Sequence, residues 1–251
     1  SAASDVYKRQ VKGLYTAYSG LTVQQKRLDV VSNNLANATT TGYKKEGLTT
    51  QSFKDVYGIK VKDETVGYIN QNIGTLNLGA KVGESFRSWD QGSFQNTGNT
   101  FDFALSGSGL FSISFTNKAG ETSTLYTRDG SFQMNREGYL VTKDGDFVLG
   151  ENGPIQLPTD FEKLTVEESG EIYADGQYVD RFALVDFENY DYVEAYGENL
   201  YRAVDGATQT DAAATVNQGY LEASNINVVT EMVDMTVSYT HLRAHETPEH
   251  L

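Results

Sequence analysis

A row of leucines at seven-residue spacing is the feature that most limits how this 251-residue chain can fold. The row consists of Leu14, Leu21, Leu28 and Leu35, each followed three residues later by Ala17, Gln24, Val31 and Ala38. A heptad repeat of this length predicts a helix that packs lengthwise against another helix. An amphipathic helix lying on the core of its own domain is the alternative that the repeat alone leaves open.

The residues after the leucines predict that this helix ends near Ala38, with a turn at Gly42. Asn33, Asn34 and Asn37 compete with the helix for backbone hydrogen bonds, and Gly42 can adopt the positive φ of a helix terminus. The stretch NNLANATTTGYK, placed after a leucine heptad repeat, resembles the N-terminal signature of the flagellar axial proteins, which are rod, hook and hook-associated subunits. The matching residues are Ser32, Asn33, Asn34, Leu35, Ala36, Asn37, Thr41, Gly42, Tyr43 and Lys44.

A second stretch, NQGYLEASNINVVTEMVDM at residues 217–235, resembles the C-terminal signature of the same family. Its motif residues are Gly219, Leu221, Glu222, Ser224 and Asn225. The resemblance implies a second helix that returns to pair with the first, and Asn227 is a good N-cap for it. The assembly seam of the first helix would then continue through Ile226, Val229 and Val233.

The two ends of the chain do not read as natural protein sequence. Residues 1–10 and 237–251 correspond to the translation of a transposon sequencing adapter and its reverse complement, so we expect them to be non-native and exclude them from fold reasoning. A basic arm and a polar tail are the alternative. The second helix, at residues 226–236, would then be truncated.

Without these ends the chain contains neither histidine nor cysteine, since the three histidines are His241, His245 and His250. Histidine is the usual general base near neutral pH, and histidine and cysteine are the usual zinc ligands. The net charge of −14 argues against nucleic acid or anionic lipid as a partner. No apolar run approaches the roughly 20 residues of a membrane span, and no signal segment precedes Leu14.

The segment between the signatures reads as β structure. Residues 46–85 have scattered apolar residues and frequent glycines, which is typical of an extended, partly β connector. From 86 to 205 apolar and polar residues alternate, and turns recur at Gly130, Gly138, Gly145 and Gly153. This spacing predicts an antiparallel β domain of hairpins, and residues 206–225 are expected to be a return linker.

These predictions combine into an α+β fold. The N-terminal helix of the assembly core lies at 11–45, and it forms a coiled-coil-like pair with the C-terminal helix. The two flank a mainly antiparallel β domain.

In a chain without histidine or cysteine, an enzyme would have to use carboxylates for catalysis. A glycosidase needs two of them and no histidine, and the candidates are Glu167, Glu168, Glu171, Asp186, Glu188 and Asp191. With 34 acidic residues in the chain, a solvated acidic face explains this clustering better. A calcium-binding adhesin is a second alternative, but residues 143–146 lack the spaced ligands of a calcium loop. We therefore expect no catalytic residue, metal, cofactor or small-molecule substrate.

The resemblance implies a structural subunit of the bacterial flagellar rod, proximal or distal, with a hook subunit as the alternative. Such subunits assemble head to tail into a helical tube through their terminal helices and transmit torque. The expected partners are copies of the chain itself and other axial proteins. The expected location is the basal body outside the cytoplasmic membrane, reached by flagellar type III export without a cleaved signal peptide.

Overall fold

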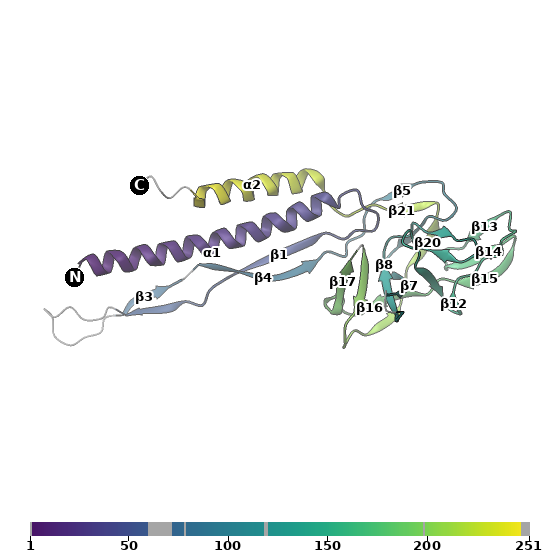
Figure 1. Ribbon diagram of the computed structural model, residues 1–251, viewed down its shortest axis with the longest axis horizontal. Coiled ribbons are helices and arrows are strands. Elements are labelled where there is room, and N and C mark those ends of the chain that lie inside the picture. Colours follow the sequence, from purple (N-terminus) through teal and green to yellow (C-terminus); the bar gives the residue numbers. More distant parts are fainter. Residues whose placement is uncertain (1, 60–71, 78, 118–119, 198, 247–251) are drawn as a thin grey trace. The chain divides into compact units, whose positions relative to one another are not determined.

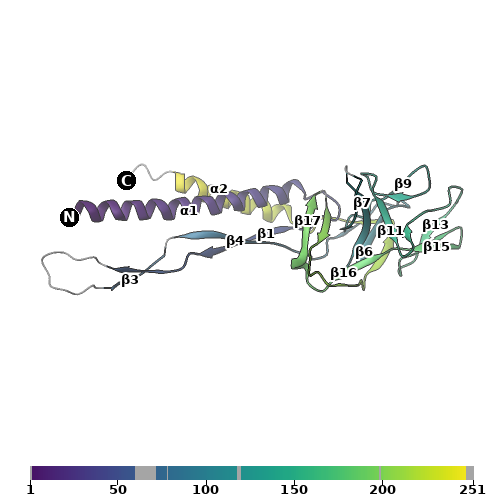
Figure 2. The ribbon, with the colours of Figure 1, turned by 60° about the horizontal axis from the view of Figure 1, so that its bottom comes forward.

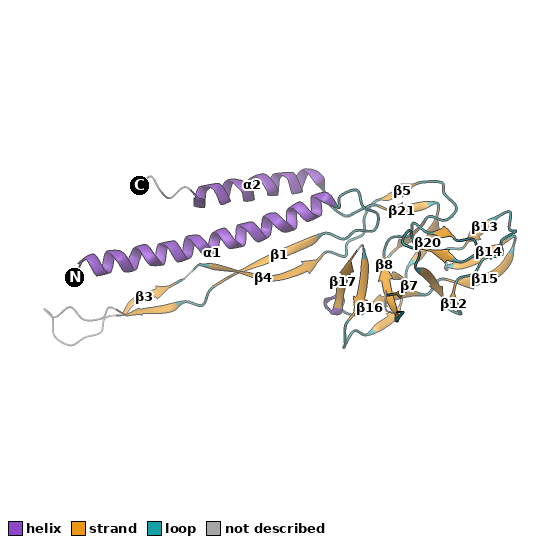
Figure 3. Cartoon of the chain, in the orientation of Figure 1, coloured by secondary structure: helices purple, strands orange, loops and turns teal. Residues whose placement is uncertain are grey.

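The structure is a computed structural model that describes residues 2–59, 72–77, 79–117, 120–197 and 199–246. It has a helix near each end and mainly antiparallel strands between them, which confirms the predicted α+β fold (Figure 3). The chain divides into unit 1, Ser1–Ala36 with Glu46–Ser88 and Asn227–Leu251, and unit 2, Asn37–Lys45 with Trp89–Ile226. Residues 60–71 and 78 of the predicted connector, and residues 1 and 247–251 of the predicted non-native ends, lie outside the described residues.

Two helices form one side of unit 1. Helix α1 (Ala2–Ala36) and helix α2 (Val228–Glu246) lie side by side, as Figures 1 and 2 both show. Asn227 caps α2, because its Oδ1 accepts hydrogen bonds from the backbone N–H groups of Val229 and Thr230 at 3.1 and 3.2 Å. The helices extend beyond the predicted limits of 11 and 236, and the foreign origin of the two chain ends stays a prediction.

The rest of unit 1 is built from antiparallel strand pairs. Strand β1 (Glu46–Ser52) pairs with β4 (Ala80–Arg87), and β2 (Val56–Ile59) pairs with β3 (Asn72–Leu76). Gly47 lies opposite Phe86, and a Cβ at Gly47 would be 2.4 Å from the end of the Phe86 ring. The Phe86 ring therefore occupies the space that a side chain at position 47 would need.

Helix α1 ends at Ala36, so the predicted helical segment 11–45 is too long at this end. The residues that follow, 37–45, belong to unit 2. The Thr40 N–H donates to the Asn37 carbonyl at 3.2 Å, and Gly42 has a φ of +68°. A turn built on asparagine, threonine and glycine thus ends the helix close to the predicted position near Ala38.

Unit 2 contains one large sheet and several smaller ones. The large sheet has the order β17–β18–β8–β7–β11–β10–β9; β12 pairs with β11, and β16 pairs with β7 and β19. Its strands are β7 (Leu110–Thr116), β8 (Thr122–Thr127), β9 (Gln133–Met134), β10 (Leu140–Val141), β11 (Phe147–Gly150), β12 (Gly153–Pro154), β16 (Leu184–Phe187), β17 (Val193–Gly197), β18 (Leu200–Ala203) and β19 (Gln209–Asp211). The run from β9 to β12 is the predicted meander, with turns at Gly138, Gly145 and Gly153.

The smaller sheets of unit 2 use strands from both ends of its sequence. They are β13 (Leu164–Val166), β14 (Glu171–Ala174) and β15 (Gln177–Arg181); β6 (Phe103–Ser106) with β20 (Thr215–Gln218); and β5 (Phe94–Asn96) with β21 (Tyr220–Glu222). A short 3₁₀ helix, η1 (Tyr190–Tyr192), precedes β17. The predicted return linker 206–225 is therefore wrong in part, because β19, β20 and β21 form there.

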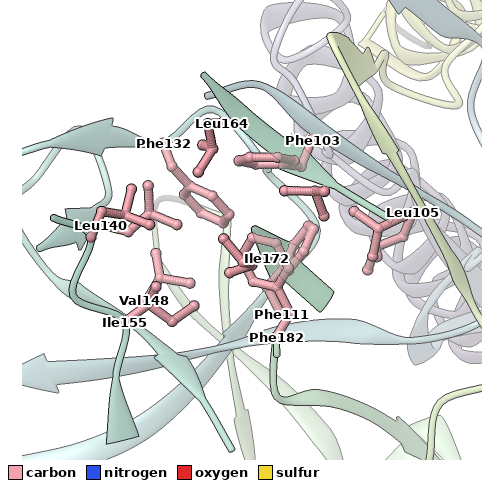
Figure 4. Packing of buried hydrophobic residues seen from close by; sticks show 13 residues of the cluster. Phe103, Leu105, Phe111, Phe132, Leu140, Val148, Ile155, Leu164, Ile172 and Phe182 are labelled. Carbon is pink, nitrogen blue, oxygen red and sulfur yellow. The ribbon is translucent and has the colours of Figure 1, made fainter. Parts of the chain in front are cut away.

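Two clusters of buried apolar side chains stabilise unit 2. In the larger cluster, the ring of Phe111 lies 5.2 Å from that of Phe132 and 5.4 Å from that of Phe182, between centroids (Figure 4). In the second cluster, Tyr201 is packed by Trp89, the only tryptophan of the chain, at 4.9 Å between centroids. Unit 2 thus has a core of its own, and Trp89 reports on it.

Candidate functional site

The predicted seam on α1 is only partly covered within the chain. Val31 is buried, Leu21, Leu28 and Leu35 are half-buried, and Leu14 is 70% exposed. The buried positions that the heptad pattern missed are Ser19, Val23 and Asn34. Helix α1 packs in unit 1 against α2, β1 and β4, so its contact face is shared among three elements and is wider than a two-helix seam.

Several apolar side chains of α2 are largely exposed. Val229 is 71% exposed and Val233 57% exposed, and Met232 lies with them. Between residues 228 and 244, the side chains that α2 buries are Glu231 and Ser238. Val229 and Val233 are therefore largely uncovered within the chain, and their place in an assembly seam stays a prediction. The third residue, Ile226, is half-buried and belongs to unit 2.

Asn34 of the N-terminal signature joins three elements of unit 1. Its Nδ2 donates to the Glu46 carbonyl at 2.8 Å and to Oε2 of Glu231 at 3.3 Å. Its Oδ1 accepts from the backbone N–H of Glu46 at 3.0 Å. Asn34 thus holds the start of β1 and a buried carboxylate of α2 against α1. The sequence offered Glu231 only as one acid among others on a helix.

The rest of the N-terminal signature enters unit 2. Gly42, Tyr43 and Lys44 are buried there, and the Gly42 N–H donates to the Glu222 carbonyl at 2.8 Å. A Cβ at Gly42 would be 2.5 Å from the backbone nitrogen of Asp129. Glycine is required at this position for two reasons, its left-handed φ and its contact with a neighbouring backbone.

Glu222 of the C-terminal signature accepts hydrogen bonds from Gly42 and Lys44 of this segment. Its Oε1 accepts from Lys44 Nζ at 2.7 Å and from the Gly92 N–H at 2.8 Å, and its Oε2 accepts from Arg128 Nε at 2.6 Å. We call Glu222, Lys44 and Arg128 the Glu222 cluster. Their side chains are at most 4% exposed, so one carboxylate and two cations share a site that is shielded from bulk solvent.

Backbone carbonyls complete the Glu222 cluster. Arg128 donates to the carbonyls of Leu105 at 2.8 Å, Gly107 at 2.6 Å and Gly109, while Lys44 donates to that of Asp90 at 2.8 Å. Desolvation lowers the pKa of Lys44 and nearby Arg128 lowers it further, whereas Glu222 opposes the shift. The glycine-rich turn of residues 107–109 is therefore bound by the guanidinium group of Arg128.

The remaining motif residues are distributed around this junction. Asn225 accepts from the backbone N–H of Lys45 at 2.7 Å through Oδ1 and donates to the Asp90 carbonyl at 3.1 Å through Nδ2. Gly219 has a φ of +80° and donates to the Asp102 carbonyl. Leu221 and Ser224 are buried, Asn37 is half-buried, and Asn33 and Ala36 are exposed.

Two of the carboxylates considered for catalysis accept hydrogen bonds from tyrosine hydroxyls. Among the described residues no group of three or more histidine, cysteine, aspartate or glutamate side chains could hold a metal ion. Asp186 accepts a hydrogen bond from the Tyr190 hydroxyl, and Glu171 accepts one from the Tyr173 hydroxyl at 2.7 Å. That hydrogen bond raises the pKa of Tyr173 to about 12. In the described part of the chain, neither helix combines the length and the apolar character that crossing a membrane requires.

Three family profiles match the chain. Residues 14–44 match the profile described as flagella basal body rod protein, residues 104–174 that of the flagellar hook protein FlgE/F/G D1 domain, and residues 217–239 that of the flagellar basal body rod FlgEFG protein C-terminal region. The first and third profiles contain the two signatures. The second covers the β meander.

Curated relatives match over most of their length. The chain is 33% identical to the flagellar basal-body rod protein FlgG of Bacillus subtilis, over 91% of this chain and 90% of the relative. It is 32% identical to the FlgG protein of Agrobacterium fabrum, over 94% and 92%. The flagellar basal-body rod protein FlgF of Caulobacter vibrioides is 33% identical, over 88% and 85%.

Proposed function

The chain belongs to the flagellar basal-body rod and hook protein family, and from this premise we propose that it is a structural subunit of the rod. The resemblance found in the two signatures is thereby confirmed. The shared hook and rod profile does not separate the two classes. The rod is favoured over the hook because the relatives that match nearly end to end are named as rod proteins.

The exposed apolar surface of the two helices carries the assembly part of the proposal. Leu14 on α1 and Val229, Met232 and Val233 on α2 are all more than half exposed, and both buried apolar clusters lie in unit 2. Covering such side chains contributes roughly 1.5–3 kcal/mol each when burial is complete. We propose that other copies of the chain and other axial proteins bury these side chains in the assembled rod.

The geometry of assembly follows from the same surface. A contact in which one face of a subunit meets a different face of the next generates an open helical assembly when the rotation between subunits does not close into a ring. We propose that the subunits stack in this way and transmit torque without catalysis. Their proposed site is the basal body outside the cytoplasmic membrane, reached without a cleaved signal peptide.

The test uses a residue that is exposed in the isolated chain. Val233→Asp should leave the stability of the monomer within about 0.5 kcal/mol, as for most surface changes. In an assembled rod the carboxylate would be buried, at a cost of several kcal/mol for each contact. A cell that relies on this variant should therefore lack rods in electron micrographs of its basal bodies and should not swim.

Thr230→Asp is the matched control, because Thr230 is also exposed on α2 and the same charge is introduced. Cells that carry it should swim. Normal rods and swimming with Val233→Asp would refute the proposal that this helix face is buried by assembly.

A further inference from the structure

The Glu222 cluster joins two chain segments that lead directly to the two helices. Lys44 follows Ala36, the last residue of α1, by eight residues, and Glu222 precedes Val228, the first residue of α2, by six. Through the rest of the sequence the same helix ends are separated by about 190 residues. The cluster is therefore a short connection between elements that are distant along the chain.

Three hydrogen bonds make this connection, and all lie inside unit 2. The Gly42 N–H donates to the Glu222 carbonyl at 2.8 Å, Lys44 Nζ to Glu222 Oε1 at 2.7 Å, and the Lys45 N–H to Asn225 Oδ1 at 2.7 Å. Main-chain and side-chain groups both take part. Because the cluster is buried, opening it would expose a carboxylate and two cations without their partners.

We propose that the Glu222 cluster is a clamp that holds the C-terminal end of α1 close to the N-terminal end of α2 in the free subunit. The helices then pair across a loop of about a dozen residues, and not across the whole β unit. Loop-closure entropy and effective concentration both favour the shorter loop. The clamp concerns the free subunit, so it goes beyond the proposed function and does not rest on it.

The clamp also predicts that two parts of the N-terminal signature differ in how well they are ordered in the free subunit. Residues 42–45 should be as well protected in the free subunit as the β meander, because they fold as part of unit 2. Residues 14–36 can loosen without opening the clamp. Protection against amide exchange should therefore change between Ala36 and Gly42.

The test compares two glycine variants in a chain that contains no cysteine of its own. Gly42→Ala would place a Cβ 2.5 Å from the Asp129 backbone, whereas Gly145→Ala adds a Cβ with no atom within 4 Å. Both glycines have a positive φ, +68° and +96°, so the backbone penalty is matched. Only the first substitution should expel residues 42–45 from the clamp.

The readout is the rate of cross-linking between the helices of the monomer. Arg27→Cys and Asp234→Cys, placed at a surface pair whose charged atoms are 3.8 Å apart, are joined with a short bismaleimide. Effective concentration falls as about the −3/2 power of loop length, so a change from about a dozen to about 190 residues would slow cross-linking roughly 60-fold. Gly42→Ala should therefore cross-link more slowly than the parent, by up to this factor. Gly145→Ala should react at the rate of the parent, and Trp89 fluorescence verifies that unit 2 is folded.

Equal cross-linking rates in the two variants, with rapid exchange of the Lys45 amide in Gly42→Ala, would overturn the clamp. If Gly42→Ala does not fold, or keeps Lys45 protected, Asn225→Ala decides, with Asn152→Ala as its control. Slower cross-linking in Asn225→Ala than in Asn152→Ala supports the clamp, and equal rates overturn it. Loss of rod formation by Val233→Asp is independent of all these rates, so the two proposals fail separately.

Discussion

Asn34 on helix α1 donates a hydrogen bond through Nδ2 to the Glu231 carboxylate on helix α2, at 3.3 Å, and both side chains are almost completely buried. A polar contact between two helices fixes their register more strongly than apolar packing does, at some cost in stability. In this chain the contact joins one residue from each signature. Helix pairing therefore depends on a specific polar pair as well as on leucines.

Asn34→Asp should separate the two helices. It places a second carboxylate against Glu231 and removes the amide that donates to both Glu231 and the Glu46 carbonyl. Disrupting a buried polar pair in this way costs about 3–5 kcal/mol. The helical signal in circular dichroism should melt at a lower temperature, while Trp89 fluorescence keeps its transition. Asn33→Asp, at the exposed neighbouring position, is the control, and an equal loss in both variants would contradict the prediction.

Glu222→Ala should be among the most damaging substitutions in unit 2. It leaves Lys44 and Arg128 buried without their carboxylate, and such a change costs about 3–5 kcal/mol. Urea unfolding followed by Trp89 fluorescence measures this loss. Glu194→Ala removes the surface pair with Arg202, at 3.4 Å, and should cost at most about 1 kcal/mol. Comparable losses in the two variants would show that the cluster does not stabilise unit 2.

The signatures themselves could be found from the sequence, but their contacts could not. Gly42, Tyr43, Glu222 and Asn225 were all identified as motif residues, and each lies at the junction. The partnership of Lys44 with Glu222 spans 178 positions, and neither residue carries a local signal of the other. Arg128 precedes an Asp–Gly turn, and nothing in the neighbouring sequence indicates that the fold places it against the carbonyls of Leu105, Gly107 and Gly109.

Strands could be predicted from the sequence where one face of the strand is buried in a core. They could not be predicted where both faces are partly exposed. The β9–β12 meander alternates visibly, since Leu140 and Val148 point into the core. Strands β1 and β4 expose part of both faces, so they show no period of two. Strand β20 lies in a segment rich in alanine and threonine, and only its pairing with β6 makes the burial of Val216 understandable.

Raising the pH should stabilise unit 2 through Lys44. Burial lowers the Lys44 pKa below 10.5, so between the folded and unfolded values the unfolded chain binds more protons. Stability therefore rises with pH in that window. The raised pKa values of Tyr126 and Tyr190 act in the opposite direction above about pH 10.

The measurement is the urea midpoint of Trp89 fluorescence between about pH 8 and about pH 9.5, below the tyrosine range. The parent chain should gain stability relative to Lys44→Met as the pH rises. Lys143→Met, at an exposed lysine, should follow the parent. Parallel curves for the parent and Lys44→Met would refute the role of Lys44.

Leu28→Asp should abolish assembly and leave unit 2 intact. Leu28 is half-buried on α1 at the centre of the heptad row, and it belongs to unit 1. In an assembled tube its carboxylate would be buried, at several kcal/mol for each contact, and the cost would recur in every subunit. The core around Phe111 lies in unit 2 and has no reason to respond. Cells that rely on this variant should therefore form no rods and not swim, while the Trp89 transition is unchanged.

Gln25→Asp separates the effect of position from the effect of charge. Gln25 is exposed on the same helix, away from the leucine row, so the added carboxylate can stay in water. Cells with this variant should swim. If Leu28→Asp also supports swimming, the leucine row is not an assembly surface. If instead it removes the Trp89 transition, then unit 2 depends on α1 and the separation of the two units in stability is wrong.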